Sequence, residues 1–252
     1  EPGDLWLLDE HRVLCGDACD QVSYGTLLQG ELAQMVISDP PYNVRIGGNV
    51  SGLGNRKHGE FVQASGELSD DEFVDFLSAF VRCLAQYSAD GSLHYLCIDW
   101  RHLHVLEGVC HRYFSRQLNL CVWVKSNGGM GSHYRSRHEL VLVFKNGTAS
   151  HINNVQLGSF GRNRTNVWEY DGCSTGTKDR RTDLNLHPTV KPAEMIADAI
   201  KDSSHLGGLI LDPFLGSGTA VIACEMTGRT CAGMELDPKY ADVIIRRWES
   251  LT

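Results

Sequence analysis

The stretch Ser38-Asp39-Pro40-Pro41-Tyr42-Asn43-Val44 follows a short apolar run, Met35-Val36-Ile37, and precedes a loop rich in glycine. The apolar run is typical of a buried parallel strand, so the carboxylate of Asp39 is expected at the carboxyl end of that strand. Ligands of open α/β sheets bind in the crevice at the carboxyl ends of the strands. The stretch therefore predicts a site of chemistry. Its candidate catalytic residues are Asp39, Pro40, Pro41 and Tyr42.

The two prolines determine which hydrogen bonds this site can make. Proline has no backbone N–H and a fixed φ, so the carbonyls here point in set directions with no neighbouring donor. Asp39 and the carbonyl of Pro40 can therefore accept two hydrogen bonds from one amino group, beside the flat ring of Tyr42. This suits the exocyclic amine of a nucleobase, because two acceptors return to the nitrogen a lone pair that is delocalised into the ring. A simple tight turn after a strand is the alternative interpretation.

Length and composition indicate one α/β domain over residues 1–252, with 42% hydrophobic residues and a substantial core. No apolar run approaches the roughly 18 residues of a membrane span, and the first residues are not a signal peptide, so we expect a cytoplasmic protein with no membrane partner. The absence of a starting Met indicates a piece cut from a longer chain. The nine cysteines form no C-x-x-C pair, which favours buried thiols over disulfides and predicts no metal site.

The net charge of −8 is unevenly distributed along the chain. Residues 112–191 contain 12 Lys and Arg against 5 Asp and Glu, a local charge of +7 that leaves −15 for the remainder. A basic segment on an acidic chain is compatible with a polyanion-binding face and equally with an ordinary solvated surface.

Two further patterns precede this basic segment in the sequence. The alternation around Leu5–Leu8 and His11–Leu14 predicts a short N-terminal hairpin. After Ser69, an acidic first turn and apolar residues at helical spacing predict an amphipathic helix that begins at that serine.

A second constellation lies near the C-terminus. The strand Leu209-Ile210-Leu211 leads into Asp212-Pro213-Phe214-Leu215-Gly216-Ser217-Gly218-Thr219, and the next strand ends at Glu235, 17 residues after Gly218. Glycines let a backbone come close to a ligand, and a carboxylate at that spacing can accept from two ribose hydroxyls. No third glycine and no phosphate-binding lysine follow, so a nucleoside without pyrophosphate fits better than NAD or ATP. A purely structural role in packing is the alternative.

Taken together, D-P-P-Y, F-x-G-x-G-T, the acid at a strand end and the H-P-T-V-K-P of residues 187–192 resemble the DNA amino-methyltransferases. These enzymes use S-adenosyl-L-methionine to methylate adenine N6 or cytosine N4. The order of the motifs resembles the circularly permuted β class, and the resemblance extends from Leu5 to Trp248. It implies a Rossmann-like α/β methyltransferase fold with a mostly parallel, seven-stranded sheet and helices on both faces. The opening residues also resemble the methylase portion that follows a ParB-like domain in longer phage and bacterial proteins.

The resemblance also implies a set of residues for the cofactor, S-adenosyl-L-methionine, and its product, S-adenosyl-L-homocysteine. The glycine turn would lie under the cofactor, flanked by acids for its adenine, ribose and methionine parts. A cationic and hydroxyl-bearing segment would meet the methionine carboxylate. The residues of the turn and its flanks are Asp212, Phe214, Gly216, Ser217, Gly218 and Thr219. The acids for the ribose and the adenine are Glu235 and Asp17, and the carboxylate-binding segment supplies His187, Thr189 and Lys191.

The expected substrate is double-stranded DNA, from which the target base is extruded and stacked on Tyr42. Residues 43–66 are expected to form a mobile loop beside the catalytic residues. Residues 125–186 form a candidate DNA-recognition region, in which Arg and Asn could read base edges. A homodimer is compatible with this interpretation.

Asp at the first position of the motif favours adenine N6 in the resembling family, whereas Ser there favours cytosine N4. Cytosine N4 is therefore the alternative within the class. A non-catalytic nucleoside- or nucleic-acid-binding module of the same fold is an alternative from another class. A methyltransferase acting on RNA or on a protein amide is a third candidate, but such enzymes more often carry Asn in place of Asp39.

Overall fold

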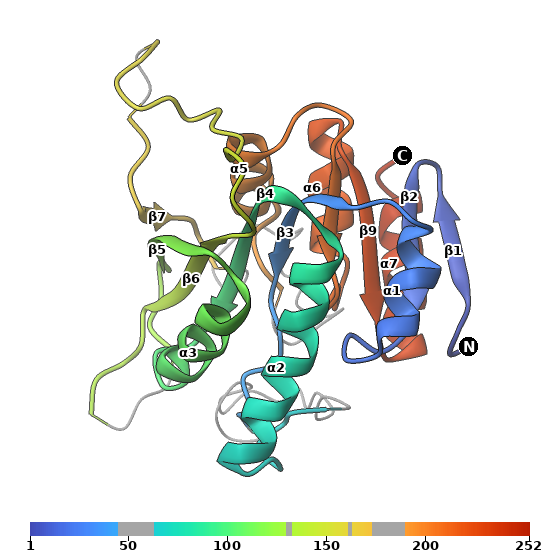
Figure 1. The fold of residues 1–252 in the computed structure, drawn as a ribbon, viewed down its shortest axis with the longest axis horizontal. Coiled ribbons are helices and arrows are strands. Elements are labelled where there is room, and N and C mark those ends of the chain that lie inside the picture. Colours follow the sequence, from blue (N-terminus) through green and yellow to red (C-terminus); the bar gives the residue numbers. More distant parts are fainter. Residues whose placement is uncertain (45–62, 130–132, 161–162, 173–189) are drawn as a thin grey trace.

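The computed structural model describes residues 1–44, 63–129, 133–160, 163–172 and 190–252 (Figure 1). Its strands are β1 (Leu5–Leu8), β2 (His11–Cys15), β3 (Ala33–Ser38), β4 (Ser88–Ile98), β5 (Arg116–Val124), β6 (His138–Lys145), β7 (Val167–Glu169), β8 (Leu209–Asp212) and β9 (Thr230–Glu235). Its helices are α1 (Gln21–Leu28), α2 (Asp70–Gln86), α3 (Leu103–Tyr113), α5 (Ala193–Ser203), α6 (Thr219–Thr227) and α7 (Pro238–Glu249). None of these helices combines the length and the apolar character that a bilayer crossing requires.

The described strands form one sheet in the order β1-β2-β9-β8-β3-β4-β6-β5-β7. The centre, from β2 to β4, is parallel, whereas β6 runs antiparallel to β4 and β5, and β1 runs antiparallel to β2. Helices α1, α2 and α3 pack against one face, while α5, α6 and α7 pack against the other (Figure 1). This is the expected α/β arrangement. It places the carboxyl ends of β3, β4, β8 and β9 side by side, along the carboxyl edge of the sheet.

Within the described residues the sheet has nine strands, so the expectation of seven was wrong. The predicted N-terminal hairpin is confirmed, and its first strand, β1, extends the sheet at one edge. At the other edge, the three residues of β7 pair in parallel with β5, with Val167 opposite Val122. Both additions are edge strands of three or four residues. The alternation in the sequence predicted β1, whereas β7 depends on β5 for its conformation, and sequence periodicity does not reveal that pairing.

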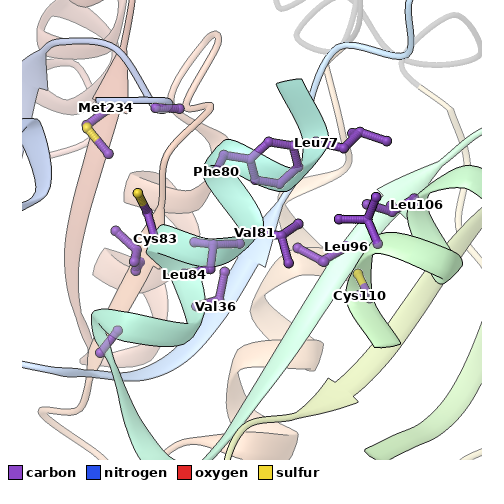
Figure 2. Packing of buried hydrophobic residues seen from close by; sticks show 14 of the residues in the cluster. Val36, Leu77, Phe80, Val81, Cys83, Leu84, Leu96, Leu106, Cys110 and Met234 are labelled. Atoms are coloured by element: carbon purple, nitrogen blue, oxygen red, sulfur yellow. The ribbon is translucent and has the colours of Figure 1, made fainter. Parts of the chain in front are cut away.

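Helix α2 illustrates how the sequence builds the core beside the carboxyl edge of the sheet. Ser69 caps it, as the sequence predicted, and the structure adds a reciprocal capping box between Ser69 and Glu72. Figure 2 shows Phe80 and Leu84 of this helix among the buried side chains of the central strands, which include Val36 and Leu96. The hydrophobic core therefore supports β3 and β4 just before their carboxyl ends.

Gly218 is required by the backbone at the start of α6. Its φ is +82°, and a Cβ built there would lie 2.8 Å from Cγ2 of Ile244 on α7. Replacement of Gly218 by alanine is expected to lower the free energy of unfolding by about 1–3 kcal/mol, the cost of holding a side chain in the left-handed region. Chemical denaturation measures this loss. The control is Gly25→Ala in α1, where a Cβ meets nothing within 4 Å and where alanine should stabilise the helix by about 0.5–1 kcal/mol.

Candidate active site

One pocket at the carboxyl edge of the sheet joins the two motifs that the sequence singled out. Asp39 follows β3, Asp212 ends β8, Glu235 ends β9, and Asp17 follows β2. Because these strands are parallel neighbours, their ends meet at the same edge. The sequence-predicted residues that line the pocket are Asp17, Asp39, Pro40, Pro41, Tyr42, Lys191, Asp212, Phe214, Gly216, Ser217, Thr219 and Glu235.

Three of the sequence-predicted residues are not placed in this pocket. Gly218 is absent from its lining, because it lies at the helix start against Ile244. Of the two glycines in the turn, Gly216 is therefore the one that lines the cavity. His187 and Thr189 lie outside the described residues, as do residues 45–62 of the predicted loop. The ends of that loop are held together by Asn43, whose side chain donates to the carbonyl of Leu68 at 2.9 Å and accepts from the amide of Gly66 at 3.0 Å.

Asp39 is held by two side chains at the wall of the pocket. The hydroxyl of Tyr42 donates to one of its carboxylate oxygens, and the ammonium group of Lys191 donates to the other. Burial raises the pKa of Tyr42 well above its ordinary value, and the neighbouring carboxylates of Asp39 and Glu139 raise it further. Tyr42 is therefore a neutral phenol that fixes the orientation of Asp39 while its partly buried ring borders the cavity.

Lys191 lines the pocket, as expected for a cofactor-binding residue, and it has two protein partners that the sequence did not predict. Its Nζ pairs with Asp39 and lies 2.9 Å from Oε2 of Glu139. Burial alone lowers the pKa of Lys191, yet the two carboxylates outweigh burial and the net pKa is raised. Its side chain is only 7% exposed. Lys191 is thus a permanently charged group in the wall of the pocket, with both neighbouring acids as its counterions.

Glu139 is the functional candidate that sequence reasoning missed. It lies near the start of β6, lines the pocket, and accepts from Lys125 as well as from Lys191. Its Oε2 also lies 3.5 Å from the hydroxyl of Tyr42. Burial raises the pKa of Glu139, but Lys191 and Lys125 pull it below the usual range.

A sequence signal for Glu139 did exist. A lysine directly after one strand and a glutamate at the start of the next indicate an ion pair if the two strands are antiparallel neighbours. In the structure, β5 and β6 pair in this way, with Trp123 opposite Glu139. The pairing of those strands was not evident from the sequence, so the signal could not be used.

The other half of the pocket is acidic and buried. Asp212 accepts from the hydroxyl of Ser38 at 2.9 Å and from the amide of Phe214 at 3.1 Å. Burial raises the pKa of Asp212 to about 7 in spite of these bonds. Glu235 accepts from the amide of Gly216 at 2.8 Å, and burial raises its pKa to about 7 as well. Two such carboxylates can bind a ligand that offers hydroxyl or ammonium donors.

The glycine turn between these acids is held in place by contacts from α7 and α2. Nη1 of Arg247 on α7 lies 3.2 Å from Oγ of Ser217 and 3.2 Å from Oγ1 of Thr219. The ring of Phe214 packs edge-on against Phe80 of α2, with 5.1 Å between the ring centroids. Helices on both faces of the sheet thus fix the turn from opposite sides.

One arginine of the candidate DNA-recognition region forms ion pairs within the protein. Arg164 is paired through Nε with Asp202, and its Nη1 lies 3.6 Å from Oδ2 of Asp198, both on α5. Its guanidinium also lies over the ring of Trp168 in β7. Arg164 therefore anchors the segment around β7 to the domain instead of offering a free charge at the surface.

Comparisons with known proteins agree with this architecture. Two similar relatives are the type II methyltransferase M.HpaI of Haemophilus parainfluenzae (23% identical over 260 residues, covering 96% of this chain and 75% of the relative) and the DNA adenine methyltransferase YhdJ of Escherichia coli K12 (24% over 261 residues, 93% and 81%). Among solved structures, the M1.HpyAVI–SAM complex superposes with a TM-score of 0.68 at 18% identity, covering 93% of this chain and 97% of the other. The cytosine-N4-specific PvuII DNA methyltransferase gives 0.68 at 14%, with 94% and 86% covered.

The structural neighbours confirm a Rossmann-like methyltransferase fold for this chain. The sequence profile of the DNA methylases named N6_N4_Mtase matches residues 33–246, a span that includes the D-P-P-Y stretch, the glycine turn and Glu235. Because this match covers most of the chain, the protein belongs to the N6/N4 DNA methylase family.

Proposed function

We propose that this protein transfers a methyl group from S-adenosyl-L-methionine to the N6 amino group of an adenine extruded from double-stranded DNA. The observation that carries the proposal is the shared pocket: Asp39 at the end of β3 and the turn Phe214–Gly216 after β8 line the same cavity. A transfer between two bound molecules requires both to be held in one enclosure, with the reacting atoms in line.

The residues present fit the cofactor. Asp212 and Glu235 are buried acceptors at the pocket wall, suited to an ammonium group and to ribose hydroxyls. Of the described lining residues, Lys191 is the one Lys or Arg, and both of its carboxylate neighbours already oppose its charge. A pyrophosphate would therefore find little positive charge, whereas a nucleoside linked to an amino acid matches the donors and acceptors. When bound, S-adenosyl-L-methionine supplies a methyl group activated by its sulfonium.

The residues around Asp39 act on the amine. Its carboxylate, paired with Lys191, and the carbonyl of Pro40 accept hydrogen bonds from the two N–H groups and localise the lone pair on nitrogen. The nitrogen would take the methyl group from the cofactor, whose sulfonium would become the thioether of S-adenosyl-L-homocysteine, and the displaced N–H proton would pass along its hydrogen bond to the carboxylate of Asp39 and from there to solvent. Extrusion of the base costs a few kcal/mol, and stacking on Tyr42, worth about 1–3 kcal/mol per base, offsets much of it. No covalent intermediate is needed.

Adenine is favoured because Asp39 begins the motif, as in the adenine-specific members that the chain resembles. Cytosine N4 is the second candidate, supported by the likeness of the fold to the cytosine-N4-specific PvuII enzyme. Incubation of unmethylated plasmid DNA with the protein and S-adenosyl-L-methionine, followed by mass spectrometry of the nucleosides, separates the two. N6-methyladenine is expected. N4-methylcytosine would support the second candidate, and the absence of any methylated nucleoside would contradict both.

Cofactor affinity is expected to fall as the pH drops below 7. The pKa of Glu235 is raised to about 7, and ribose hydroxyls donate to its ionised form, so protonation competes with binding. Below that pKa, the dissociation constant for S-adenosyl-L-methionine should rise toward about tenfold per pH unit for this one group. Isothermal titration from pH 5.5 to 8.5 measures the slope.

The variant Glu235→Gln is expected to bind S-adenosyl-L-methionine more weakly at pH 8. Its dissociation constant should also depend less steeply on pH, because the titration of Glu235 no longer contributes. Asp212→Asn is the matched control for the second acid, whose pKa is also raised to about 7. An unchanged slope in Glu235→Gln would show that Glu235 does not meet the ribose.

A further inference from the structure

We propose that Trp100 and Arg101 form a DNA-contact surface beside the catalytic pocket, on which the ring of Trp100 stacks against a base left unpaired by extrusion of the target. The proposal rests on the proposed function, because extrusion is what unpairs that base. Neither residue belongs to the motifs of the family resemblance or lines the pocket.

The sheet places these two residues at the catalytic edge. Strand β4 pairs with β3 on one side, where Leu96 lies opposite Ser38, and with β6 on the other, where Ile98 lies opposite Leu140. The chain therefore leaves β4 between the strand that leads to Asp39 and the strand that carries Glu139. Trp100 comes two residues after Ile98, within roughly 7 Å along the chain of the strand's end.

The turn that presents Trp100 is held from within. The carboxylate of Asp99 accepts from the amide of His102 at 3.0 Å, from Nδ1 of the same residue at 2.9 Å, and from Nη1 of Arg101 at 3.1 Å. The ring of His102 packs edge-on against Phe73 of α2, with 5.2 Å between the centroids. These contacts fix both sides of Trp100 while its own side chain stays in solvent.

Trp100 and Arg101 are exposed as a pair. Trp100 is 54% exposed, the side chain of Arg101 is 50% exposed, and the guanidinium lies 5.0 Å from the ring centroid of Trp100. A large ring held out of the core by a fixed turn offers a flat apolar face for a base. Arg101 beside it is paired with Asp99 through Nη1 and is half exposed, so the rest of its guanidinium can donate to a phosphate. The partner that fits both groups at this edge is a DNA strand with an unstacked base.

The test compares the full chain with Trp100→Ala, Trp100→Phe and Arg101→Ala, using plasmid DNA and S-adenosyl-L-methionine in excess. In Trp100→Ala, the KM for DNA should rise roughly 5- to 150-fold, the equivalent of one base stack, with unchanged cofactor affinity. Trp100→Phe should recover most of the loss. Arg101→Ala should weaken DNA binding and reduce the slope of log affinity against log salt by about one.

The matched controls are Trp6→Ala and Arg246→Ala. Trp6 is 44% exposed on β1, at one end of the sheet, and Arg246 is 77% exposed on α7. Both variants should bind and methylate DNA as the unmodified chain does, and thermal melting checks that all variants are folded.

The two proposals fail in different ways. If the unmodified chain methylates DNA and Trp100→Ala keeps its KM and DNA affinity, or if Trp6→Ala loses as much, the contact surface is refuted and the proposed function stands. If the unmodified chain yields no methylated nucleoside yet loses DNA affinity on Trp100→Ala, the proposed function fails while the DNA contact is supported.

Discussion

Replacement of Asp39 by alanine is expected to lower the rate constant for methyl transfer by about 100- to 1000-fold, or about 2.7–4 kcal/mol of transition-state stabilisation, the usual cost of deleting one preorganised hydrogen-bonding group. The carboxylate is fixed by Tyr42 and Lys191 before any substrate arrives, so its loss removes an acceptor already in place. Single-turnover transfer of tritiated methyl groups to DNA measures the effect without interference from product release.

Cofactor titration provides the control for this prediction. Asp212 and Glu235, and not Asp39, are the acids proposed to bind the cofactor, so the affinity for S-adenosyl-L-methionine should change little. Asp39→Asn keeps one acceptor oxygen but loses the charge, and it should retain more activity than the alanine variant. A rate equal to that of the unmodified protein in Asp39→Ala would refute the assigned role.

Replacement of Lys191 by methionine is expected to lower the free energy of unfolding at neutral pH by about 3–5 kcal/mol, the cost of removing one partner from a buried ion pair. The change leaves Asp39 without its cation and Glu139 with Lys125 alone. Urea denaturation at several pH values measures the loss. Lys201→Met is the matched control: Lys201 is 53% exposed in its pair with Asp198, and such surface pairs contribute about 0–1 kcal/mol.

The pH dependence of this loss follows from the two pKa shifts. The raised pKa of Lys191 contributes stability that is complete below its ordinary value near 10.5 and is lost only as the pH rises through the folded value. The lowered pKa of Glu139 contributes stability that is present above its ordinary value of 4.5 and is lost as the pH falls through the folded value. The gap between Lys191→Met and the unmodified protein should therefore be largest at neutral pH and shrink below pH 4.5. Glu139→Gln added to Lys191→Met should recover part of the stability; no recovery would contradict a role for Glu139 as a counterion.

Features set by local chemistry were predictable from the sequence. The capping serine and the spaced phenylalanines define α2, alternation defines the N-terminal hairpin, and a short apolar run before D-P-P-Y defines β3. The common edge of the two motifs also followed, because parallel strands bring their carboxyl ends together.

Features set by contacts between distant segments were not predictable. Strand β7 is three residues long and depends on β5 for its conformation. Glu139 reaches the site only because β6 runs antiparallel between β4 and β5. Lys191 was recognised as a cation beside the pocket, but its partners come from β6 and the end of β3, some 50 and 150 residues earlier in the chain. No local pattern encodes a choice between a ligand carboxylate and two protein carboxylates.

The strand order β2-β9-β8-β3 has a consequence for folding during synthesis. Strands β2 and β3 are consecutive in the chain but are not neighbours in the sheet, because β8 and β9, which come much later in the chain, lie between them. Before residues Leu209–Glu235 emerge from the ribosome, β2 and β3 of the nascent chain each lack one neighbouring strand of the final sheet, β9 and β8 respectively. The wall of the pocket that carries Asp212 and Glu235 is consequently completed last, after the strands that position Asp39 and Glu139 have been made.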